Sequence, residues 1–142
     1  MPASVVLFRT LLLTSVACGI VGSFIDGLFP SLIPRPLADA FEALPPPPAI
    51  ALFGASMLFL VTFGGVVTAV IGLYRFQPWA RPLALLMTAL GLLFYPLLGT
   101  TVLSGWAQFF LEISSVLWGA VLAMSYVSSL STRFVDSPTR DF

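Results

Sequence analysis

The chain has 142 residues, of which 58% are hydrophobic and only 8% are charged. Soluble domains carry roughly a quarter charged residues, so six basic and six acidic side chains are too few to cover a surface that faces water. A formal net charge of zero offers no basic surface for nucleic acid. We therefore expect membrane lipids to surround most of the chain and to be its first partners.

Residue types that the chain lacks exclude several kinds of site. Histidine and lysine are absent, so neither a Ser-His-Asp triad nor a Ser-Lys dyad can form. Cys18 is the single cysteine, which excludes an internal disulfide and a thiolate metal site within one chain. We expect a non-enzymatic protein with no catalytic residues, no cofactor and no metal ion.

Four apolar segments predict four transmembrane helices, at about residues 5–29, 49–74, 82–101 and 103–130. Each reaches or exceeds the roughly 20 residues that cross about 30 Å of hydrocarbon. Helices are expected because a backbone in lipid has to satisfy its own hydrogen bonds. The predicted fold class is all-α, with residues 1–142 forming one integral membrane domain, a four-transmembrane-helix bundle.

The first segment contains the stretch TSVACG, which is similar to the cleavage site of a bacterial lipoprotein signal peptide. Ser15 stands where that site usually has leucine, and the apolar run continues past Cys18 to Phe29. We therefore expect an uncleaved helix, in which Cys18 is a small packing residue.

The first loop, residues 30–48, is the largest segment predicted to lie outside the membrane. Within it, Leu37, Phe41 and Leu44 are spaced as on one face of a helix, and Pro36 suits a helix start. This pattern predicts a short amphipathic helix on the outer membrane surface. The four prolines that follow cannot continue the helix, and we expect them to form an extended spacer.

Arginine placement predicts the orientation, because short cytoplasmic loops are enriched in basic residues. The outer side carries only Arg35, and the inner side carries the other five arginines: Arg9, Arg75, Arg81, Arg133 and Arg140. Arginine as the only basic residue, with abundant alanine, leucine and proline, is typical of a GC-rich bacterial genome. We expect a multi-pass protein of the bacterial inner (cytoplasmic) membrane with both termini, including the tail at residues 131–142, in the cytoplasm.

A faint internal similarity links the two halves of the chain. The stretches RTLLLTSVACG and RPLALLMTALG align Arg9 with Arg81 and Gly19 with Gly91. The similarity has two readings, which the sequence leaves open: a parallel repeat of two helical hairpins, or chance matching between apolar stretches of low complexity.

The fourth segment carries a glutamate, Glu112, in its interior. At helical spacing its face is small and polar, with Gly105, Gln108, Ser115, Gly119 and Ala123. We expect this face to point into the bundle, since the opposite face suits lipid. The first segment has a matching stripe, Ser15, Gly19, Gly22 and Asp26, and the second has Gly54, Gly65, Thr68 and Gly72. Small residues at such spacings let membrane helices approach closely.

Glu112 has two interpretations at this stage. In the functional one, Glu112 and Asp26 form a proton or cation site, where a buried carboxylate couples proton uptake to a conformational change. In the structural one, Glu112 is satisfied by Gln108, by Ser115, or by Arg35 folding in from the first loop.

The sequence favours a small scaffold or accessory subunit that packs with itself as a homo-oligomer or with another membrane protein. An alternative is a small proton- or cation-coupled transporter or channel that uses Glu112. A second alternative is a membrane protein that contacts lipid headgroups through Arg75 and Arg81.

Overall fold

A computed structural model describes residues 3–45, 48–94, 102–127 and 130–134. These residues form helices and connecting turns and contain no strand, which confirms the all-α prediction. In chain order the elements are α1 (Ala3–Leu28), η1 (Pro30–Leu32), α2 (Arg35–Glu42), α3 (Ala49–Tyr74), α4 (Ala80–Phe94), α5 (Gly105–Val127) and η2 (Ser131–Phe134).

Three helices are long and apolar enough to cross a membrane, by length and composition: Ala3–Leu28, Leu52–Tyr74 and Gly105–Val127. They support a membrane protein. The segment predicted at residues 82–101 corresponds to α4, whose 15 residues extend only about 22 Å at the α-helical rise. Residues 95–101, which complete the predicted segment, lie outside the described part of the chain. The four-crossing count therefore stays a prediction.

The helix expected in the first loop is present as α2. Proline occupies its first turn, where a missing N–H leaves no hydrogen bond unmade. Leu37, Phe41 and Leu44 are all exposed, so the apolar side chains of this segment have little cover from the rest of the chain. Part of the predicted proline spacer, residues 46–47, lies outside the described ranges, and Pro48 has the extended backbone that the spacer requires.

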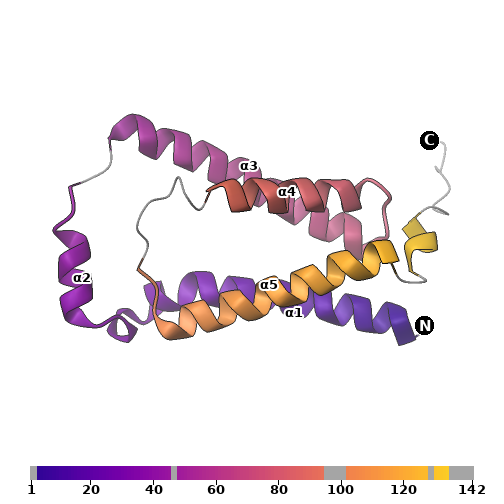
Figure 1. The fold of residues 1–142 in the computed structure, drawn as a ribbon, viewed down its shortest axis with the longest axis horizontal. Helices are drawn as coiled ribbons and strands as arrows, with labels where there is room; N and C mark the ends of the chain where they lie inside the picture. Colours follow the sequence, from indigo (N-terminus) through magenta and orange to yellow (C-terminus); the bar gives the residue numbers. More distant parts are fainter. Residues whose placement is uncertain (1–2, 46–47, 95–101, 128–129, 135–142) are drawn as a thin grey trace.

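The four long helices pack as two pairs (Figure 1). α1 runs along α5 and α3 runs along α4, while α1 with α3 and α4 with α5 make fewer contacts. The chain direction alternates from helix to helix, so the start of α1 and η2 lie at the same end of the molecule. α2 lies at the opposite end, where the two pairs diverge.

Small residues of α1 form the interface with α5, as the sequence predicted for that stripe. The Ser15 hydroxyl donates to the Ser114 carbonyl at 2.9 Å, and the Ser114 hydroxyl donates to the Ser15 carbonyl at 2.8 Å. A Cβ on Gly22 would lie 2.9 Å from Leu111 Cγ and 3.1 Å from the Ala107 carbonyl oxygen. The two backbones approach so closely that hydroxyl–carbonyl bonds can join them directly.

The turn from α3 to α4 is tight and contains a residue in the left-handed region. Phe76 has φ of 58°, and the bonds from its N–H to the Leu73 carbonyl and from the Gln77 N–H to the Gly72 carbonyl form a Schellman motif. Glycine usually occupies this position, because a side chain there is strained. Packing of the ring explains why phenylalanine occupies position 76. The ring of Phe76 is buried, and its centroid lies 5.4 Å from that of Phe8 and 5.2 Å from that of Phe134.

Two arginines lie beside this aromatic cluster (Phe8, Phe76 and Phe134) and contact the ends of helices. Arg9 Nη2 donates to the carbonyl of Tyr74, the last residue of α3, at 3.4 Å. Arg81 Nη1 donates to the carbonyl of Ser125, in the last turn of α5, at 3.1 Å. Carbonyls at a helix C-terminus lack intrahelical donors and carry partial negative charge, so both arginines complement them.

The pairing of helices is the one that a parallel repeat would produce. A parallel repeat relates the hairpin α1–α3 to the hairpin α4–α5, so that α1 corresponds to α4 and α3 corresponds to α5. Under this relation the α1–α5 pair corresponds to the α4–α3 pair, and the structure contains both pairs. The aligned arginines also match in role, because Arg9 and Arg81 each contact the C-terminal end of the second helix in their own hairpin. Both observations fit a repeat, which stays a hypothesis beside chance similarity.

Candidate functional site

Asp26, near the end of α1, is bound to the start of α5. Its carboxylate accepts the Ser104 backbone N–H at 2.8 Å and also the Ser104 hydroxyl. The hydroxyl oxygen of Ser104 in turn accepts a hydrogen bond from the backbone N–H of Ala107 at 3.1 Å. Ser104 is therefore the N-cap residue of α5. A carboxylate at this position also complements the partial positive charge of the helix N-terminus. Asp26 thus fixes the start of α5.

Glu112 is exposed in the single chain, as are Gln108 and Ser115. The prediction that this face points into the bundle is therefore wrong for one chain alone. α5 instead buries the neighbouring face, with Ala107, Val121, Leu122 and Ser125. The reason is the packing of α5 on α1. Ser114 and Leu111 of α5 lie against Gly19 and Gly22 of the α1 stripe, and this rotation of α5 turns Glu112 away from α1.

The predicted polar site is not assembled within one chain. The side chains of Glu112 and Gln108 make no hydrogen bond or ion pair with the described residues, and the Ser115 hydroxyl donates to the Leu111 carbonyl of its own helix at 3.0 Å. Asp26 contacts Ser104, which precedes Glu112 by eight residues, or about 12 Å along a helix axis. No bond between Asp26 and Glu112 occurs.

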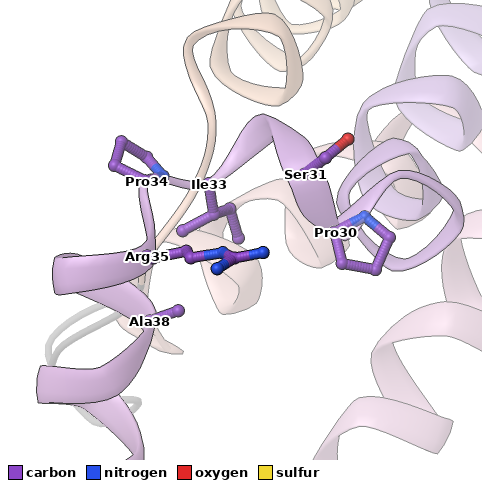
Figure 2. Close-up of a pocket in the computed structure, with 6 residues that line it drawn as sticks. All are labelled: Pro30, Ser31, Ile33, Pro34, Arg35 and Ala38. Atoms are coloured by element: carbon purple, nitrogen blue, oxygen red, sulfur yellow. The ribbon is translucent and has the colours of Figure 1, made fainter.

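Arg35, the proposed partner of Glu112, lies at the start of α2 and forms no ion pair with the described residues. Its side chain helps to line a pocket of about 470 Å³ between η1 and α2, with Pro30, Ser31, Ile33, Pro34 and Ala38 (Figure 2). The structure therefore places Arg35 in a different site from Glu112.

The two arginines predicted to contact lipid headgroups differ in their surroundings. Arg75 is exposed, and its side chain makes no hydrogen bond or ion pair with the described residues. Arg81 is half-buried, is bonded to the Ser125 carbonyl, and lies over the rings of Tyr126 and Phe134 at 5.2 and 4.9 Å. Only Arg75 keeps its donors available to a headgroup.

Arg9 is the residue whose role the sequence reading missed. Its guanidinium lies 4.4 Å from the centroid of the Tyr74 ring and 5.6 Å from that of Phe76. A cation over an aromatic face is attracted by the ring's quadrupole. The alignment of Arg9 with Arg81 was the signal that could have revealed this role.

Within the described ranges, no group of three or more His, Cys, Asp or Glu residues could hold a metal ion. By length and composition, the three long apolar helices are those of a small helical membrane protein. Comparisons with protein-family models, with curated proteins and with solved structures each found no match to this chain.

Proposed function

We propose that this chain is a non-enzymatic scaffold or accessory subunit of the membrane that associates through the exposed polar face of α5. Glu112 carries the proposal, since it is exposed on a helix long enough to cross a membrane and has no partner among the residues that the structure describes. Contact of an ionisable side chain with lipid is unfavourable by roughly 2.5–3.5 kcal/mol at the centre of such a helix on insertion scales. Glu112 lies seven residues after the start of α5 and incurs a smaller cost. A second protein surface at this face removes that contact.

A second copy of the chain is the partner that this face suits best. Gly105 and Gly119 have open space around their Cα atoms and are exposed, which permits a close approach of two α5 helices. In a twofold-symmetric pair, the Gln108 side-chain amide of one copy supplies donors near Glu112 of the other. Polar contacts of this kind join membrane helices.

The proposed topology has four crossings of a bacterial inner membrane, with both termini in the cytoplasm. It is supported by the position of the start of α1 and of η2 at one end of the molecule. Arg9 and Arg81 lie at that same end, beside the aromatic cluster. α2 at the opposite end would then rest on the outer surface, with its apolar side chains in the interface.

Cysteine crosslinking tests the association. In a Cys18→Ser background, Ser115→Cys should give a disulfide-linked species of twice the 15.2 kDa chain mass when membranes are oxidised. Val116→Cys is the matched control, because Val116 is the next residue, is 70% exposed, and lies on a different face of the helix. A crosslink from position 115 to a different protein would keep the accessory role and replace the partner. Equal crosslinking at 115 and 116, or none at either, would refute the interface.

A further inference from the structure

The pocket between η1 and α2 has one charged and one hydroxyl side chain among apolar walls. Arg35 supplies the charged donors, and Pro30, Ser31, Ile33, Pro34 and Ala38 supply the remaining lining. In Figure 2 the Arg35 side chain extends from the start of α2 past Ile33 toward η1. The guanidinium is thus directed into the pocket.

Arg35 is not neutralised by the acids of its own helix. Asp39 lies one turn after Arg35, a spacing at which opposite charges commonly pair on a helix surface. The described residues nevertheless contain no ion pair of Arg35 with Asp39 or with Glu42, and both acids are exposed. The guanidinium therefore retains donors for an anion from outside the chain.

The location of the pocket limits which anion it meets. η1 begins two residues after the end of α1, a 26-residue apolar helix about 39 Å long, which is more than the hydrocarbon thickness. The pocket therefore lies at the level where the chain leaves the hydrocarbon. Next to it, Leu37 and Phe41 of α2 are exposed, as in helices that lie at the headgroup boundary.

We propose that this pocket binds the phosphate of a membrane lipid headgroup. The Arg35 guanidinium donates to two phosphate oxygens in the forked geometry that suits this group. The proline and isoleucine side chains contact the adjoining glycerol and upper acyl carbons. This site is independent of the α5 interface, since it requires no second copy.

Native mass spectrometry of the full chain, released from phosphatidylglycerol micelles or nanodiscs, tests the site. The wild-type monomer should retain phosphatidylglycerol and should not retain diacylglycerol, which has the same chains and no phosphate. Arg35→Gln should lower retention about fivefold, equivalent to about 1 kcal/mol. Arg75→Gln, which removes the same charge from an arginine outside the pocket, should lower retention less than Arg35→Gln does.

Three outcomes would overturn the site: unchanged retention in Arg35→Gln, equal losses in Arg35→Gln and Arg75→Gln, or equal retention of diacylglycerol. Complete displacement of the lipid by millimolar inorganic phosphate would also overturn it, because the pocket would then hold a free ion. Circular dichroism of each variant controls for folding. Retention is scored on the monomer peak, so failure of the dimer interface leaves this test intact.

Discussion

Glu112 lies on the exposed surface of α5, where the large apolar side chains of Phe109 and Val116 are exposed as well. The carboxylate has no partner in the described chain, although α1 and α5 satisfy each other's serines only a short distance away. A serine hydroxyl can donate a hydrogen bond to a backbone carbonyl of a neighbouring helix. An ionised carboxylate only accepts hydrogen bonds, so Glu112 needs donor groups. On the proposed interface those donors come from the partner copy.

The proposed α5 interface predicts different results for two substitutions of the single residue Glu112. Glu112→Gln keeps hydrogen-bonding groups and should leave crosslinking from position 115 unchanged. Glu112→Leu removes them and suits lipid, so it should lower crosslinking by about threefold or more, as expected for one polar contact between membrane helices. The yield is measured in the Cys18→Ser, Ser115→Cys background.

The transporter alternative predicts another pattern for Glu112→Gln. Glutamine cannot gain and lose a proton, so a proton-coupled carrier would lose uptake in proteoliposomes while its folding and crosslinking stayed intact. Proton flux followed with a trapped pH-sensitive dye distinguishes the two roles. Flux in the wild type that disappears in Glu112→Gln would favour transport over a scaffold.

At element scale, the α1–α5 contact depends on the absence of a side chain at Gly22. Gly22→Leu should separate the helices, because its Cβ alone would lie 3.1 Å from a backbone oxygen of α5. Overpacking of this kind destabilises by about 1–3 kcal/mol. Gly27→Leu is the control on the same helix, since nothing lies within 4 Å of a Cβ there. Helicity followed by circular dichroism during a dodecyl sulfate titration measures both; equal stability of the two variants would contradict the interface.

The elements differ in how far the sequence specifies them. Apolar length predicted the three long helices, and the spacing of Leu37 and Phe41 predicted α2. The small-residue stripe correctly identified the contact face of α1. The face of α5 was assigned wrongly because both of its sides contain small residues, and a helical wheel cannot tell which side meets α1. That choice is made by Ser114 and Leu111, which fit opposite Gly19 and Gly22.

The polar site was harder to predict than the helices, for a related reason. Asp26 and Glu112 are both carboxylates on membrane-level helices, so sequence reading grouped them together. Their difference comes from the tertiary structure. Asp26 accepts hydrogen bonds from Ser104 at the start of α5, while Glu112 meets no donor within the described ranges of its own chain. Likewise, the separate roles of Arg75 and Arg81 depend on which side chain lies over the rings of Tyr126 and Phe134.

At the scale of the whole molecule, the proposed four crossings predict that both termini share one side. Epitope tags before Met1 and after Phe142 should both be protected from protease in sealed, right-side-out membranes. A cysteine at Glu42, in the Cys18→Ser background, should react with an impermeant maleimide from outside. Exposure of only one tag would indicate three crossings, the number given by the three longest helices.

The pairing of the first helix with the last also constrains synthesis. A ribosome adds about 5–20 residues per second, so α1 enters the bilayer several seconds before α5 exists. During that interval Ser15 and Asp26 have no α5 groups to bond, and the α3–α4 pair has to be threaded in meanwhile. Folding can be completed only after α5 has been synthesised. Until then the nascent chain lacks the contacts between α1 and α5.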